Sequence, residues 1–170
     1  HASSDLVEWK VAREIEAFFH GKSSGLDVAT ISYAQPILFS LQEGPRVLNS
    51  PQAQSFFSNP QRVRFTFHDT GLRALTTDCI QRVEASASAG DALMNQAVRY
   101  AWEGLSGEVL PLDRLQKIKQ SMELSTEAYD EWGILPLEAR KIQQELKDQG
   151  AIASRLTGAG LVTIDEQLLD

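Results

Sequence analysis

The chain has 170 residues, of which 42% are hydrophobic, and a formal net charge of −7, as expected for a globular protein with a core. This negative charge argues against nucleic acid or an anionic membrane as partner, because both require a basic face. The single cysteine, Cys79, cannot form an intrachain disulfide, so we expect a cytoplasmic protein. Because the chain starts at His1 close to a helix and without a Met, we interpret it as a fragment.

The first 60 residues predict two helices, a strand and a linker. Residues 5–19 show helical periodicity, and a short helix is expected over 28–33 and a strand over 37–41. The side chains expected on one face of the first helix are Leu6, Val7, Val11, Ile15 and Phe18. From 42 to 60 the composition changes to Gln, Asn, Ser and Pro, with turn pairs at Gly44-Pro45 and Asn59-Pro60. We interpret this stretch as a domain boundary.

The remaining sequence predicts a strand, four helices and a β-hairpin. Residues 62–67 alternate apolar and polar side chains, as a strand does. Helices are expected over 72–87, over 91–104, from Pro111 and from Pro136 to Gly150, with Leu137, Ile142 and Leu146 facing inward. Strands over 151–156 and 161–164 follow. This order indicates an α+β fold in which helices cover one face of a small antiparallel sheet.

The segment His20-Gly21-Lys22-Ser23-Ser24-Gly25-Leu26-Asp27 is the first candidate site. Glycines allow a close approach of the backbone to a ligand, and hydroxyl and N–H groups suit phosphate. An aspartate directly after such a turn can accept a proton or bind a metal. The alternative is an ordinary cap or turn, which the same residue types form.

A second segment, Ser154-Arg155-Leu156-Thr157-Gly158-Ala159-Gly160, lies far downstream. Together the two segments resemble the H-G-x-x-S-G-x-D and K-L-T-G-A-G motifs of the mevalonate kinase branch of the GHMP small-molecule kinases. The resemblance implies that residues 1–60 form the tail of the first, catalytic lobe with its linker, and that 61–170 form the ferredoxin-like C-terminal lobe. It also implies that a last helix and strand follow Asp170.

The resemblance implies transfer of the γ-phosphoryl group of ATP, with Mg²⁺, to a hydroxyl of mevalonate. Asp27 would be the catalytic residue, acting as base or charge stabiliser, and we assign no protein ligand for a metal. The residues implied to bind substrate or phosphate are Ser23, Ser24, Gly25, Thr76, Thr157, Gly158, Ala159 and Gly160. For Thr157 to Gly160 an ordinary hairpin turn is the alternative, and for Thr76 a helix-surface position. His68 with Asp69 could form a metal-binding or acid–base pair, and the alternative is a strand end followed by a turn cap.

The sequence departs from the family in two respects. Leu161 and Val162 replace the glycine run that follows T-G-A-G, and Arg155 stands where the family prefers Lys. The family's P-x-x-x-G-L-G-S-S phosphate loop and its early lysine are not found, so we expect the fragment to be inactive alone. The alternatives are a kinase for another isoprenoid intermediate or a sugar, and a degenerate module with a binding or regulatory role. A homodimer is also compatible with the sequence.

Overall fold

The computed structural model describes residues 2–20, 23–48, 50–51, 53–54, 63–72, 76–86, 89–106, 111–157 and 160–166. The chain divides into two compact units, His1–Ala53 and Gln54–Asp170, referred to as unit 1 and unit 2. The division lies inside the stretch interpreted as a boundary. Each unit is described by itself, and the assignment of the two units to kinase lobes stays a prediction.

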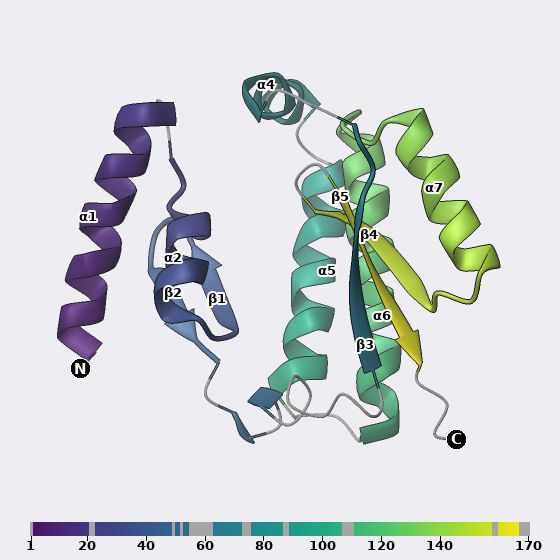
Figure 1. The fold of residues 1–170 in the computed structure, drawn as a ribbon, viewed down its shortest axis with the longest axis horizontal. Helices are drawn as coiled ribbons and strands as arrows, with labels where there is room; N and C mark the ends of the chain where they lie inside the picture. The colour runs from purple at the N-terminus through teal and green to yellow at the C-terminus, as the bar shows by residue number, and fades with distance from the viewer. Residues whose placement is uncertain are drawn as a thin grey trace. The chain divides into compact units, whose positions relative to one another are not determined.

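The elements of unit 1 that the structure describes in full are two helices and a β-hairpin (Figure 1). Its elements in chain order are α1 (Ala2–His20), α2 (Leu26–Tyr33), β1 (Ile37–Ser40) and β2 (Gly44–Val47). The two strands are antiparallel, with Ile37 opposite Val47 and Ser40 opposite Gly44. The predicted helices and the first strand are therefore confirmed, with α1 and α2 slightly longer than expected.

The described part of the apolar stripe predicted for the first helix does not form the core of unit 1, and the side chains of Leu6 and Val7 lie outside the described residues. Val11, Ile15 and Phe18 are 50%, 56% and 85% exposed, whereas Trp9 on a different face of α1 is only 5% exposed. The ring of Trp9 packs edge-on against Phe39 of β1, with ring centroids 6.3 Å apart. The expectation was wrong because one large aromatic side chain, and not the row of aliphatic ones, fills the interior of this unit.

The hairpin corrects the linker prediction at Gly44-Pro45. Both residues lie in β2, and the turn comes before them, at residues 41–43. Proline lacks an N–H, yet a two-stranded sheet has only edge strands, where this loss is tolerated. Gly44 is buried, and a Cβ added to it would lie 3.4 Å from the Trp9 ring. Gly44 and Pro45 are therefore the first residues of a strand, and Gly44 packs against the ring of Trp9.

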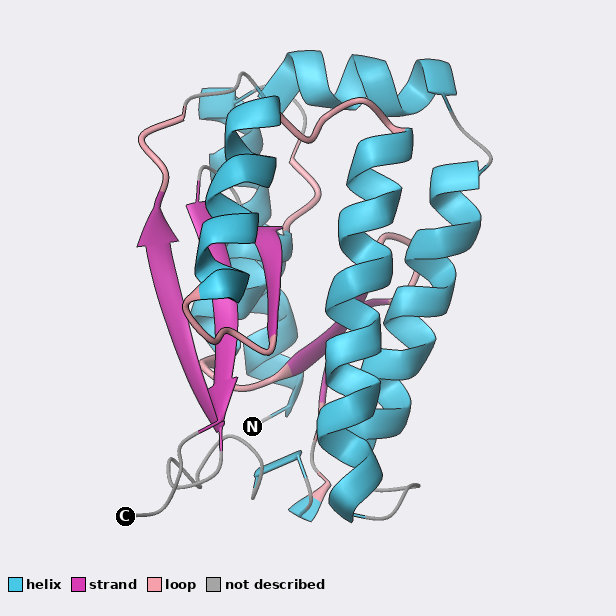
Figure 2. Ribbon diagram, turned by 90° about the vertical axis from the view of Figure 1, so that its right-hand side faces the viewer, coloured by secondary structure: helices cyan, strands magenta, loops and turns pink. Residues whose placement is uncertain are grey.

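Unit 2 is a three-stranded antiparallel sheet packed with helices (Figures 1 and 2). Its strands are β3 (Val63–Asp69), β4 (Ala153–Thr157) and β5 (Gly160–Glu166), in the order β3-β5-β4. Its helices are α4 (Thr76–Ser86), α5 (Ala89–Ser106), α6 (Pro111–Glu131) and α7 (Leu137–Asp148). The predicted helices, the alternating strand and the closing hairpin are all confirmed in type and order.

The core of unit 2 lies between α6 and the sheet. Ile118 and Met122 of α6 pack against Ala153 and Ile164, and partly buried Phe65 joins them from β3. Helices α5 and α6 lie side by side in both views (Figures 1 and 2). Of the residues expected to face inward on α7, Leu137 is 62% exposed, which corrects that expectation. Leu137 is the first residue of α7, directly after the cap residue Pro136, before the helix meets the strands.

One edge of this sheet is covered by side chains. The carbonyl oxygen of Ser154 in β4 accepts hydrogen bonds from the Gln143 amide of α7 and the Thr126 hydroxyl of α6, each at 3.3 Å. These bonds satisfy a group that an edge strand otherwise leaves to solvent. The α+β architecture is thus confirmed, and among the described helices none is long and apolar enough to cross a membrane.

Candidate functional site

The segment between α1 and α2 forms a tight bend, Ser23-Ser24-Gly25, from which α2 starts. Gly25 has φ of +81°, a left-handed conformation that favours glycine. The Ser23 hydroxyl accepts the N–H of Gly25 at 2.9 Å, and the Ser24 hydroxyl accepts the N–H of Leu26 at 3.2 Å. Both serine hydroxyls therefore accept backbone N–H groups at the start of α2. This is what the alternative of an ordinary cap or turn describes.

Three side chains of α1 hold this bend in place. The indole N–H of Trp9 donates to the carbonyl oxygen of Gly25 at 2.8 Å, and Arg13 Nε donates to the carbonyl oxygen of Ser23 at 3.3 Å. The Ser23 hydroxyl also donates to the carboxylate of Glu16. A Cβ on Gly25 would lie 2.9 Å from Arg13 Cδ and 3.1 Å from the Trp9 ring. Gly25 is thus required both by its φ and by the close approach of α1.

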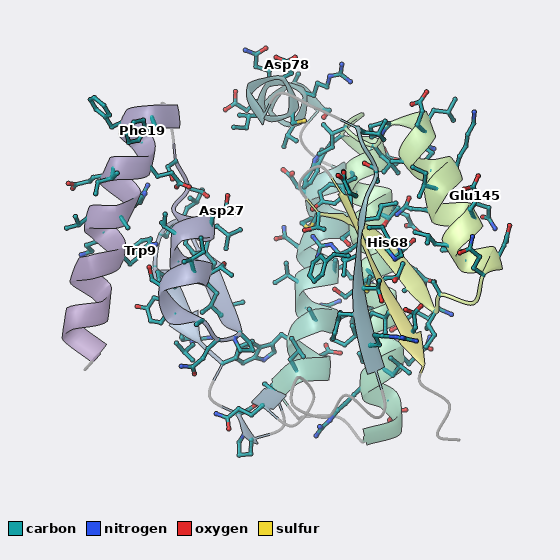
Figure 3. All side chains as sticks on the ribbon, in the orientation of Figure 1. Trp9, Phe19, Asp27, His68, Asp78 and Glu145 are labelled. Carbon is teal, nitrogen blue, oxygen red and sulfur yellow. The ribbon has the colours of Figure 1, made fainter. Side chains whose placement is uncertain are left out.

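Asp27 lies in the first turn of α2 and is exposed (Figure 3). No hydrogen bond or ion pair links its carboxylate to the described residues. The first N–H groups of a helix have no acceptor within the helix. Here the serine hydroxyls already accept those of Gly25 and Leu26, and the exposed Asp27 carboxylate comes next in the chain. A carboxylate in this position is favourable for the helix dipole and is accessible to a small molecule.

The second candidate segment is the end of the β4–β5 hairpin in unit 2. Thr157 is exposed and pairs with Gly160, and Gly160 pairs on its other side with Asp69 of β3. A Cβ added to Gly160 would lie 2.6 Å from the carbonyl oxygen of His68. The close approach of β3 therefore explains this glycine by itself, without a ligand.

The other predicted residues of unit 2 are only partly covered by the structure. Gly158 and Ala159 lie outside the described residues. Thr76 is the first residue of α4, and its side chain also lies outside what the structure describes.

The structure brings Ser23, Ser24, Gly25 and Asp27 together in unit 1, and it brings Thr157 and Gly160 together in unit 2. The two groups belong to different units, so their meeting in one pocket stays a prediction.

His68 and Asp69 adopt the structural roles given as their alternatives. Nε2 of His68 lies 3.1 Å from the hydroxyl of Thr163, which is itself buried on the neighbouring strand. The carboxylate of Asp69 accepts the N–H of Gly71 at 2.9 Å and so caps the turn after β3. Both side chains are engaged in holding the sheet and the turn that follows it.

The fit of a magnesium–nucleotide complex depends on oxygen ligands. Mg²⁺ is usually bound through one or two protein carboxylates, with phosphate and water supplying the rest. The described residues contain no group of three or more His, Cys, Asp or Glu side chains arranged around a metal. The exposed carboxylate of Asp27 is of the chemical type that such a complex uses as its one or two protein ligands.

The sequence analysis did not single out Trp9, Arg13 or Glu16. Their spacing of four and three residues places them on one face of α1, and this stripe was the signal that could have revealed the contact with the bend. It was overlooked because a mixed aromatic and charged stripe resembles a solvated face more than a packed one.

Comparisons with known proteins add no assignment. No protein-family model matches the chain, and no curated protein shows a significant sequence match to it.

Proposed function

We propose that this chain is part of an ATP-dependent small-molecule kinase of the GHMP kind, with the hydroxyl of mevalonate as phosphoryl acceptor. The proposal is supported by the difference between the backbone of the bend, which hydrogen bonds hold in place, and the Asp27 side chain, which is exposed. The backbone of Ser23-Ser24-Gly25 is held from α1 by Trp9 and Arg13, whereas the Asp27 carboxylate beside it has no partner among the described residues. An acid that is exposed but placed on a fixed backbone is suited to act on a bound substrate.

In the proposed reaction the acceptor oxygen attacks the γ-phosphorus of ATP. A bond forms between this oxygen and phosphorus, the bond from phosphorus to the β–γ bridging oxygen breaks, and ADP leaves. The acceptor proton passes to the Asp27 carboxylate as base, or it passes to solvent water while the same carboxylate stabilises the positive charge that develops on the acceptor oxygen. When bound, Mg²⁺ neutralises charge on the phosphates.

The serine bend and the hairpin have supporting roles in this proposal. The exposed Ser24 hydroxyl, which accepts the Leu26 N–H, keeps its own proton to donate to a phosphate oxygen beside Asp27. By the same resemblance, Thr157, Gly158, Ala159 and Gly160 would form a turn beside the acceptor and phosphates, and Thr76 would face the acceptor and phosphates. The nucleotide loop itself is not found among these 170 residues, so the activity belongs to the complete protein.

The proposal is tested by measuring ADP formation from ATP–Mg²⁺ by the complete protein that contains this chain, with mevalonate, related isoprenoid alcohols and sugars as acceptors. Asp27→Asn is expected to lower kcat by roughly a hundredfold to ten-thousandfold, the range for loss of a general base, with KM changed little. Asp78→Asn is the matched control, because Asp78 is also an exposed aspartate in the first turn of a helix; it should retain full activity.

Two results would contradict the proposal. Unchanged turnover in Asp27→Asn would remove this residue from the mechanism. Absence of ADP formation with every acceptor, together with no heat of binding at millimolar ATP–Mg²⁺, would favour the alternative of a binding or regulatory module.

A further inference from the structure

We propose that Trp9 is a positioning residue for Asp27, acting through the carbonyl group of Gly25. This inference rests on the proposed kinase function and extends it to a side chain of α1 outside the motif. Trp9 lies on the side of α1 that faces the bend, whereas Phe19 projects from the end of the same helix and is exposed (Figure 3).

The carbonyl oxygen of Gly25 accepts two hydrogen bonds. The carbonyl oxygen of Gly25 accepts the N–H of Ala29 at 3.0 Å, which is the first hydrogen bond of α2, and the indole N–H of Trp9 at 2.8 Å. A carbonyl oxygen has two lone pairs, so both acceptor positions are filled. Trp9 therefore fixes the peptide plane from which α2 begins.

Asp27 lies between the two ends of that first helical hydrogen bond, Gly25 and Ala29. Its backbone lies within the turn that the Ala29 N–H to Gly25 carbonyl hydrogen bond closes, and its side chain makes no hydrogen bond or ion pair to a described residue. A displacement of about 1 Å at a catalytic group can lower a rate a hundredfold. Turnover should therefore respond to the loss of the indole N–H, although this group is buried and donates to the backbone of Gly25.

Several contacts besides the hydrogen bond fix the position of the Trp9 ring. The ring packs edge-on against Phe39, Gly44 lies next to it, and the Arg13 guanidinium carbon lies 5.9 Å from the ring centroid. These contacts belong to the ring and not to its N–H. Trp9→Phe removes the donor together with the outer indole atoms Cζ2, Cζ3 and Cη2 that lie next to Gly25 and Gly44. A control variant that loses the same indole atoms without losing a hydrogen bond is therefore needed to separate positioning from packing.

Unit 2 offers a matched control. The indole N–H of Trp132 is buried and makes no hydrogen bond to any described residue. Trp132→Phe therefore removes the same atoms as Trp9→Phe without removing a hydrogen bond. Any effect of indole loss on packing or folding alone should appear in both variants.

The experiment measures kcat and KM of the complete protein for wild type, Trp9→Phe, Trp132→Phe, Asp27→Asn and the double variant Trp9→Phe/Asp27→Asn. We expect Trp9→Phe to lower kcat about tenfold or more with KM nearly unchanged, and Trp132→Phe to leave kcat unchanged. Because Trp9 acts through Asp27, the Trp9→Phe effect should disappear in the Asp27→Asn background. Should Trp9→Phe fail to fold, Arg13→Lys loosens the same bend by removing the Nε donor to Ser23 and is measured in its place.

The outcomes separate the two proposals. Wild-type kcat in Trp9→Phe, or an undiminished Trp9→Phe effect in the Asp27→Asn background, overturns positioning while the kinase proposal stands. Normal turnover in Asp27→Asn, or no turnover by the wild type, overturns the kinase mechanism and the positioning role with it.

Discussion

Gly160 of β5 lies so close to His68 of β3 that a Cβ at position 160 would be 2.6 Å from the His68 carbonyl oxygen. Real Cβ atoms do not approach a backbone oxygen to this distance. The glycine that ends the Thr157–Gly160 motif is therefore required by the pairing of two strands. A substrate contact at this hairpin would be an additional role for a residue that the sheet already needs.

The first prediction follows from this contact. Gly160→Ala should destabilise the protein by about 1–3 kcal/mol, the usual cost of overpacking, because the obstructing atom belongs to the backbone of a paired strand. Urea unfolding followed by far-UV circular dichroism measures the change. Thr157→Ala is the control: Thr157 is opposite Gly160 and exposed, so this change should stay within about 0.5 kcal/mol. Equal midpoints for both variants would contradict the prediction.

The second prediction concerns the covered edge of the sheet. Gln143→Leu removes one of two side-chain donors to the buried carbonyl oxygen of Ser154, and we expect a loss of about 1–2 kcal/mol in the free energy of unfolding. Thr126 compensates little, because its single hydroxyl proton is shared with the carbonyl oxygen of Met122. Chemical denaturation gives the value, and the neighbouring exposed Gln144→Leu serves as control. A Gln143→Leu protein as stable as the control would show that the edge carbonyl does not need this donor.

The third prediction is a stabilising substitution. The Ser154 hydroxyl is buried, at 2% exposure of the residue, and makes no hydrogen bond to any described residue. Ser154→Ala should therefore raise stability by up to about 1 kcal/mol, because a desolvated polar group is removed. Ser125→Ala is the comparison, since its equally buried hydroxyl donates to the Met122 carbonyl oxygen at 2.9 Å and its loss should be destabilising. Melting temperatures that fall in both variants would rule out the prediction.

The fourth prediction tests the bend independently of any enzymatic activity. Ser23→Ala removes both the acceptor for the Gly25 N–H and the donor to Glu16. Hydrogen exchange measured by NMR should be faster at the Gly25 amide, by roughly the tenfold that corresponds to about 1.4 kcal/mol. Ser24→Ala, at an exposed position, should affect mainly the Leu26 amide. Unchanged exchange at Gly25 would mean that Ser23 does not hold the bend.

The sequence predicted the helices and the closing hairpin well because their apolar spacing is regular. It failed at β2, since Gly44-Pro45 is typical of a turn and only the contact with the Trp9 ring shows why these residues form a strand. It also misassigned the inner face of α1. Periodicity identifies a stripe but cannot decide between the row of Val11, Ile15 and Phe18 and the row that contains Trp9.

The residue types of the candidate site could be predicted from the sequence, but the hydrogen bonds from α1 that hold its backbone could not. Hydroxyls, glycine and an acid in eight residues indicate a bend with Asp27 beside it, and the structure has this bend. The stripe of Trp9, Arg13 and Glu16 indicates which face of α1 could pack on the bend. It does not indicate the acceptors of Trp9 and Arg13, which are backbone carbonyl groups ten or more positions away with no residue-specific signature.

The burial of Trp9 also gives unit 1 an optical label of its own. The sequence contains three tryptophans, and Trp102 and Trp132 both belong to unit 2. A protein with phenylalanine at those two positions would have a single indole fluorophore, sequestered beside the bend. The fluorescence emission of Trp9 should shift to longer wavelength when unit 1 unfolds and exposes the indole to water. The unfolding of unit 1, which contains Asp27, could then be followed separately from that of unit 2.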